Sequence, residues 1–142
     1  MGALGTDRNT LRKGIDRIVC DNALIAANTT IFNGAIVATN AAGDLVPASD
    51  TAGLTVQGRA RQAMKNTTGA PVAIDPPSGV EAGVFKYDTS GGSAITKADV
   101  GQNCFILDDH TVVRTGGTVH AIVCGVVDSI DSDGGVWVKI NY

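Results

Sequence analysis

The sequence predicts an all-β chain, and three observations carry this prediction. Val, Ile and Thr supply 41 of the 142 residues, whereas Leu supplies 6 and Glu only 1, a balance that favours strands over helices. Short apolar runs alternate with turn residues, and most of the 18 glycines lie between those runs. No long stretch has the spacing of apolar residues that is typical of a helix. These features predict a single antiparallel β-barrel or a jelly-roll-like sandwich.

The N-terminal residues differ in character from the rest of the chain. Leu4, Leu11 and Ile15 have weak helical spacing, which glycines interrupt. We therefore expect residues 1–17 to form an extended N-terminal arm. Residues 18–142 have an ordinary length for one domain with its own core, so we expect them to form the barrel or sandwich.

Each expected strand is a short apolar run bounded by turn signals. The first three runs follow Asn33-Gly34, Gly43-Asp44 and Gly53. In chain order, the runs are residues 35–38, 45–47, 54–56, 72–74, 83–87, 104–107, 111–113, 119–127 and 136–140.

The last two runs predict a β-hairpin over residues 119–140. Positions 136, 138 and 140 are apolar and alternate with a mixed face that contains Trp137, which we expect at an interface. A polar loop with two glycines separates the runs. Gly125 interrupts the first of them and indicates a bulge or a close backbone approach.

Charge is distributed unevenly along the sequence. Residues 1–65 contain seven Lys/Arg and five Asp, whereas residues 66–142 contain four Lys/Arg and nine Asp/Glu. Four cations lie in the expected arm, which therefore either lies on an acidic protein surface or nucleic acid, or is a solvated tail. Few aromatic residues and the acidic balance of the body argue against direct nucleic-acid binding.

The sequence lacks the patterns of several classes of protein. Cys20, Cys104 and Cys124 are odd in number and lack CxxC spacing, so we expect reduced thiols, mostly in the core. The N-terminus lacks a signal-peptide pattern and no apolar stretch is long enough to span a membrane, which predicts synthesis in the cytoplasm. No phosphate-binding loop is present.

Two polar groups are candidates for a site, and each has a plainer interpretation. The loop with Asp128, Asp131, Asp133 and Gly134 has some features of a calcium site, but its spacing is irregular and no closing Glu follows. A hairpin turn is the better interpretation.

The second polar group is Asp108, Asp109 and His110, near Cys104. These are ligand types for a metal, and they also suit an oriented base, but a polar turn between two strands explains them better. We expect His120 on the surface of a strand, with no nucleophilic Ser to partner it. The sequence therefore predicts no catalytic residue, metal or cofactor.

The strand and turn framework resembles that of a known family over residues 19–140. The stretches that carry this resemblance are residues 31–37, 43–53, 56–60, 83–85, 95–101, 104–112, 121–128 and 136–138. They resemble the small head-decoration, or cement, proteins of tailed phages. The shared features are turn glycines and strand starts, and none is a catalytic motif.

The resemblance implies a β-barrel or sandwich that sits as dimers or trimers over junctions between major capsid subunits and resists the pressure of packaged DNA. It implies a virion location after synthesis in the bacterial host, with the major capsid protein as partner and no enzymatic activity. A tail or baseplate β-module is an alternative, and a small-ligand-binding or enzymatic barrel is a weaker one. The candidate capsid contacts are the cations of the arm, a stiff loop tip and one aromatic residue: Arg8, Arg12, Lys13, Arg17, Pro76, Pro77 and Trp137.

Overall fold

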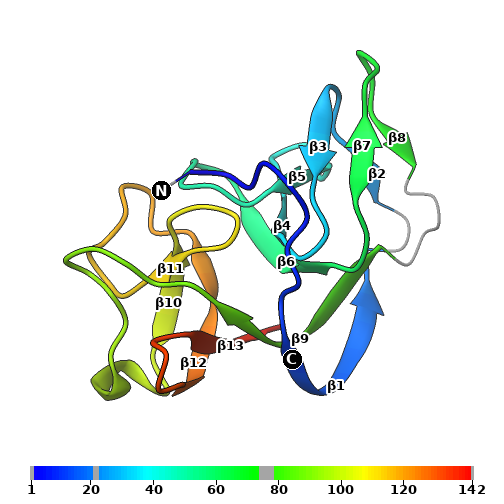
Figure 1. Cartoon of the computed structure of the whole chain (residues 1–142). Coiled ribbons are helices and arrows are strands. Elements are labelled where there is room, and N and C mark those ends of the chain that lie inside the picture. The colour runs from blue at the N-terminus through cyan, green and yellow to red at the C-terminus, as the bar shows by residue number, and fades with distance from the viewer. Residues whose placement is uncertain (1, 21–22, 74–78, 142) are drawn as a thin grey trace.

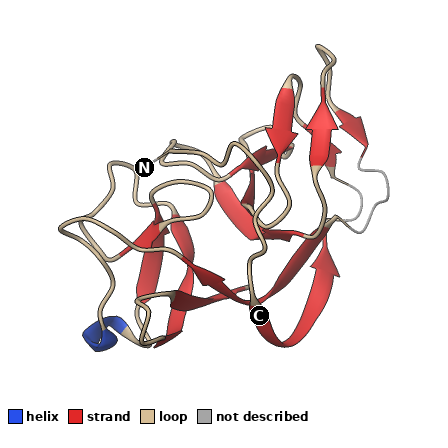
Figure 2. Cartoon of the chain, in the orientation of Figure 1, coloured by secondary structure: helices blue, strands red, loops and turns tan. Residues whose placement is uncertain are grey.

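The computed structural model describes residues 2–20, 23–73 and 79–141, without the side chains of residues 15 and 16. Its regular structure is almost entirely strand (Figures 1 and 2), so the all-β prediction is confirmed. The elements in chain order are β1 (Arg12–Val19), β2 (Leu24–Ile25), β3 (Thr29–Ile31), β4 (Ile36–Thr39), β5 (Leu45–Pro47), β6 (Thr55–Ala60), β7 (Met64–Asn66), β8 (Val72–Ala73), β9 (Val80–Tyr87), the 3-10 turn η1 (Lys97–Asp99), β10 (Asn103–Ile106), β11 (Val112–Val113), β12 (Val123–Ile130) and β13 (Val136–Ile140).

Most of these strands belong to one large mixed sheet. Its order is β11-β10-β12-β13-β9-β6-β4-β5-β2-β8, with β1 attached to β9, while β3 and β7 form a separate pair. Among the described residues β11 and β8 do not pair, and they lie on opposite sides of the molecule in Figure 1. The described strands therefore do not close into the expected antiparallel barrel, and β2 even runs parallel to β5. The jelly-roll-like sandwich, the other expected architecture, stays a prediction.

The N-terminal segment is part of the body rather than a projecting arm. Strand β1 pairs antiparallel with β9, from Arg12 opposite Phe85 to Val19 opposite Val80. The expected boundary at residues 17 and 18 thus falls inside a strand. Ahead of β1 the chain runs across the body, where the Arg8 amide donates to the Asn33 carbonyl at 2.7 Å.

Strand β4 packs apolar side chains on both of its faces. Alternation along a strand sends Ile36 and Val37 to opposite sides, and both are fully buried. Ile36 belongs to a core cluster with Phe85 and Tyr87 of β9, and Val37 belongs to a second cluster with Val80. The large sheet therefore separates two cores, and burying each large apolar side chain contributes about 1.5–3 kcal/mol.

The predicted hairpin is confirmed over β12 and β13, which pair from Val126 opposite Lys139 to Ile130 opposite Val136. Its expected start is wrong, because residues 119–122 lie outside the strand. Ala121 has a φ of 51° there, which interrupts extended backbone. The prediction for Gly125 is confirmed: a Cβ at this position would lie 2.0 Å from the Lys139 carbonyl oxygen.

Two further sequence expectations concern the cysteines and the membrane. All three cysteines are free thiols, with Cys104 and Cys124 buried and Cys20 half-buried. Within the described residues, no helix has the length and apolar character needed to cross a membrane.

Candidate contact surface and polar clusters

Arg8 is fastened to the body by several contacts. Its guanidinium donates to the Thr10 hydroxyl at 2.7 Å and to the Lys86 carbonyl at 3.1 Å. It also pairs with Asp88 at 3.1 Å and lies 5.3 Å from the centre of the Tyr87 ring. The Arg8 side chain is only 20% exposed. It therefore fixes the N-terminal segment to β9 and offers little surface to a partner.

Arg12 belongs to a cluster around a buried carboxylate that the sequence analysis did not single out. Glu81 of β9 is fully buried. It accepts hydrogen bonds from Arg59 at 2.7 Å and Arg12 at 3.2 Å, and the Arg61 Nε lies 3.5 Å away. The sequence contains one indication of this buried charge, because Glu81 is its only glutamate and lies inside an apolar run. These contacts join β1, β6 and β9.

Lys13 and Trp137 are brought together by the pairing of β1 and β13 with β9. The Lys13 ammonium lies 4.7 Å from the centre of the Trp137 ring and 2.8 Å from Asp128 Oδ2. The hydrogen bond from Lys13 holds the pKa of Asp128 below its usual value. Both predicted contact residues thus have partners within the chain, while the Lys13 side chain remains 45% exposed.

Arg17 lies near the C-terminal end of β1 and is exposed. Its guanidinium donates to the Asn141 carbonyl at 2.7 Å. Arg12 and Lys13 also keep about half of their side chains exposed on β1, although each is paired with a carboxylate of this chain. The other predicted contact residues, Pro76 and Pro77, lie outside the described residues.

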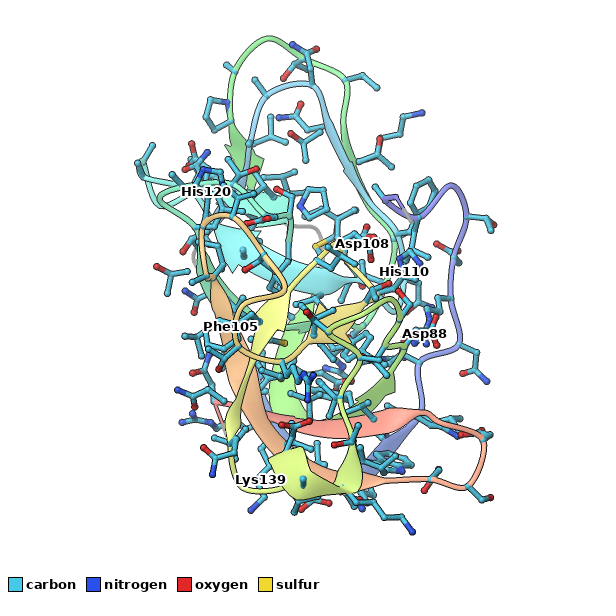
Figure 3. All side chains as sticks on the ribbon, turned by 90° about the vertical axis from the view of Figure 1, so that its left-hand side faces the viewer. Asp88, Phe105, Asp108, His110, His120 and Lys139 are labelled. Carbon is cyan, nitrogen blue, oxygen red and sulfur yellow. The ribbon has the colours of Figure 1, made fainter. Side chains whose placement is uncertain are left out.

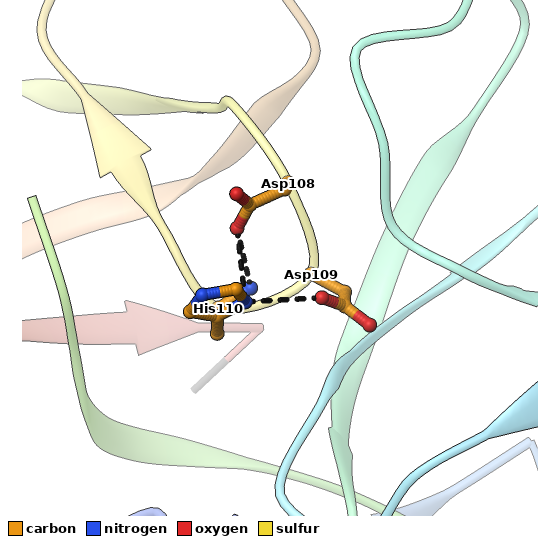
Figure 4. Close-up of side chains that lie close together, drawn as sticks. All are labelled: Asp108, Asp109 and His110. Atoms are coloured by element: carbon orange, nitrogen blue, oxygen red, sulfur yellow. Dashed lines mark hydrogen bonds and ion pairs between the residues drawn. The ribbon is translucent and has the colours of Figure 1, made fainter. Parts of the chain in front are cut away.

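Asp108, Asp109 and His110 form a compact cluster in the turn between β10 and β11 (Figure 4). The His110 Nδ1 lies 3.1 Å from Asp108 Oδ1 and 3.1 Å from Asp109 Oδ1. Their potential ligand atoms all lie within 4.8 Å of one another. Asp108 Oδ2 is buried without a hydrogen-bond partner in the described part of the chain.

The same residues account for the turn that the sequence predicted. Asp108 Oδ1 accepts the His110 backbone amide at 3.1 Å, and the Leu107 amide donates to the Thr111 carbonyl at 3.0 Å. Asp109 Oδ1 also accepts the backbone amide of Leu4 at 2.9 Å. The cluster therefore closes the turn between β10 and β11 and anchors the N-terminal segment on it.

His120 lies in a loop, apart from the Asp108–His110 turn (Figure 3), and not on a strand as predicted. The Asp50 carboxylate accepts the backbone amides of Val119 and His120, each at 2.8 Å. Partial burial opposes the charge on Asp50, but these amides and the His120 ring outweigh it and lower the pKa of Asp50. Asp50 thus holds the loop before β12, a contact between residues about 70 positions apart that no local pattern indicates.

The acidic loop between β12 and β13 is the predicted hairpin turn. The Lys86 ammonium lies 2.6 Å from Asp133 Oδ2 and 3.0 Å from Asp131 Oδ2. The hydrogen bonds from Lys86 lower the pKa of both carboxyl groups. Asp128, the third carboxylate of the possible calcium site, pairs with Lys13 instead. Lysines therefore neutralise the carboxylates of this loop.

No protein-family model, no curated protein and no solved structure matches this chain.

Proposed function

We propose that this chain is a structural virion protein that binds the assembled head of a tailed phage and stabilises it by bridging major capsid subunits. The observation that carries this proposal is the position in the fold of the stretches that resemble head-decoration proteins. Residues 31–37 run from the end of β3 into β4, and residues 104–112 span β10 to the start of β11. Residues 121–128 run from the preceding loop into β12, and residues 136–138 lie in β13. The resemblance thus lies in turns and strands that set the framework of the fold.

The exposed charge of β1 supports a docking role for this strand. The side chains of Arg12 and Lys13 are 52% and 45% exposed, and Arg17 is exposed as well. A basic strand suits an acidic patch of the major capsid protein, since complementary charge directs association and fixes orientation. Because the chain binds the assembled shell and not free subunits, shell stability rises with occupancy. As in the family it resembles, the chain acts as a dimer or trimer and catalyses no reaction.

Co-sedimentation tests this proposal. The purified chain is mixed with heads of the encoding phage from which it has been stripped, and separately with unassembled major capsid protein and with isolated tails. We expect saturable binding to heads alone. Absence of binding to heads overturns the proposal, and binding to tails establishes the tail or baseplate alternative.

A pair of charge-reversal variants tests the role of β1. Arg17→Glu places a negative charge on the proposed docking strand, and Lys97→Glu makes the same change in η1, on the other side of the molecule in Figure 2. We expect Arg17→Glu to weaken head binding by about tenfold, which is about 1.4 kcal/mol, and Lys97→Glu to leave it unchanged. Equal effects of the two variants would show that binding depends on net charge and not on β1.

A further inference from the structure

Two buried cysteines on neighbouring strands have no part in the proposed function. Cys104 of β10 is fully buried and Cys124 of β12 is 4% exposed. Both belong to the same core cluster. Cys20 is half-buried and packs with the other core.

The register of β10 and β12 brings the two side chains together. Cys104 lies opposite Gly125 and Phe105 lies opposite Val123, so Cys124 is the extra residue of a bulge. The bulge turns Cys124 toward the face that Cys104 occupies, and both side chains are buried in the same core cluster. The Cys104 thiol donates to the Gly125 carbonyl at 3.7 Å, next to Cys124. Cys104 lies opposite Gly125, the neighbour of Cys124, so the two cysteines occupy adjacent positions on paired strands. Paired strands lie about 4.7–4.9 Å apart, and a disulfide joins Cα atoms roughly 4.4–6.8 Å apart.

We propose that Cys104 and Cys124 are a latent cross-strand disulfide, which forms when the folded chain meets a small disulfide oxidant such as oxidised glutathione. The structure describes the reduced form, which a reducing cytoplasm maintains. Oxidation joins β10 to β12 covalently at adjacent positions of strands that are already paired.

The reaction proceeds by two exchanges. The Cys124 thiolate attacks one sulfur of oxidised glutathione and releases the first glutathione thiolate. The Cys104 thiolate then attacks the Cys124 sulfur of this mixed disulfide and releases the second. The two protons lost by the cysteines pass to the released thiolates, and two electrons reduce the oxidant to two glutathione molecules.

The environment of Cys124 decides which thiol reacts first and how fast. Cys124 lines a surface cavity of about 400 Å³ together with Ala121, Ile122 and Asn141, so a small oxidant approaches this thiol from solution. Interaction with the neighbouring Cys104 thiol, together with burial, raises the pKa of Cys124. Because the thiolate is the attacking species, exchange is slow at neutral pH and accelerates as the pH rises.

The disulfide would fasten one edge of the sheet. It closes a loop over residues 105–123, which contains the Asp108–His110 turn, strand β11 and the residues that Asp50 holds. A crosslink of this kind restricts the unfolded chain and opposes detachment of β10 and β11. We expect oxidation to raise the melting temperature by roughly 4–8 °C or more.

Peptide mapping of the full chain tests the proposal. The native protein is incubated with oxidised glutathione at pH 8.5, remaining thiols are alkylated, and the product is digested with trypsin without reduction. Cleavage after Arg114 separates Cys104, in residues 98–114, from Cys124, in residues 115–139. The expected product is these two peptides joined, two hydrogen atoms lighter than their sum, together with a melting temperature that returns to its starting value after reduction.

Variants separate this disulfide from the other possible reactions. Cys20→Ser should leave both the linked peptide and the rise in melting temperature intact, whereas Cys104→Ser should abolish the link. Should Cys104→Ser fail to fold, mapping of the unsubstituted chain still decides, because Cys20 lies in a third tryptic peptide, residues 18–59. Stable glutathione adducts without a link, a link to Cys20, or unreacted Cys104 and Cys124 in the folded chain would each overturn the proposal.

Discussion

At the scale of single residues, Glu81 and its arginines show how burial decides the value of an ion pair. Glu81 is fully buried, and Arg59 is 12% exposed whereas Arg12 is 52% exposed. Removing one partner of a buried pair leaves the other charge without compensation, whereas exposed pairs contribute little because water screens them. The two arginines should therefore differ in their contribution to stability although both bind the same carboxylate.

We expect Arg59→Gln to lower the free energy of unfolding by about 3 kcal/mol, and Arg12→Gln to lower it by less than about 1 kcal/mol. Urea denaturation followed by tryptophan fluorescence measures both values. Equal losses for the two variants would show that exposure does not set the strength of these pairs. Glu81 is the single glutamate of the sequence. Its partners could not have been predicted, because they lie 22 and 69 positions away and no local pattern connects them.

At the scale of elements, the contact between β12 and β13 depends on the absence of a side chain at Gly125. A Cβ there would lie 2.0 Å from the Lys139 carbonyl oxygen, and a backbone atom cannot yield as a flexible side chain does. We expect Gly125→Ala to lower the free energy of unfolding by about 1–3 kcal/mol, because the added methyl group forces the two strands apart. Gly92→Ala is the matched control, because nothing lies within 4 Å of its added Cβ. Similar melting temperatures for the two variants would contradict this account.

The turn of the same hairpin should make stability depend on pH. Asp131 and Asp133 have lowered pKa values because Lys86 donates to both. Their contribution is therefore present above the unfolded pKa, near 3.8, and is lost as the pH falls through the lower folded values. We expect Lys86→Met to reduce the loss of melting temperature below about pH 4, most clearly at low salt, since ions screen exposed pairs. A pH profile parallel to that of the unsubstituted chain would contradict this.

The elements that the sequence predicted are those whose pattern is local. Strand β13 alternates apolar and polar residues, and two glycines mark the turn before it, so the hairpin was found. Strand β1 was missed because its charged residues and Gly14 leave no apolar alternation, and because its partner β9 lies more than 60 residues away. His120 was misplaced because the Val-rich run looks continuous, whereas Asp50 and the positive φ of Ala121 hold residues 119–122 in a loop.

At the scale of the whole molecule, the strand order was beyond prediction because it depends on which distant edges meet. Composition and turn spacing fix an all-β chain, but closure into a barrel requires the first and last strands of the sheet to pair. Here those positions belong to the two-residue strands β8 and β11. Strand β9 instead pairs with three strands that are far apart in the sequence, namely β1, β6 and β13. Strand β9 is thus the centre of the fold.

Because β9 is central, the N-terminal residues should behave as part of the domain. Deleting residues 1–19 removes β1, which pairs with β9 at five positions. Since each hydrogen bond contributes about 1 kcal/mol, we expect the free energy of unfolding to fall by several kcal/mol. Deleting only residues 1–6 removes the bond from the Leu4 amide to Asp109 and should cost about 1 kcal/mol. Urea denaturation of the two truncated chains measures the difference.

Small and equal losses for the two truncations would show that residues 1–17 are an arm, as the sequence analysis expected. The outcome also decides how capsid binding is interpreted. If removing β1 unfolds the sheet, loss of head binding in the longer truncation reports a damaged fold and not a lost contact. Arg17→Glu, which leaves the strand in place, is then the variant that can assign a docking role to β1.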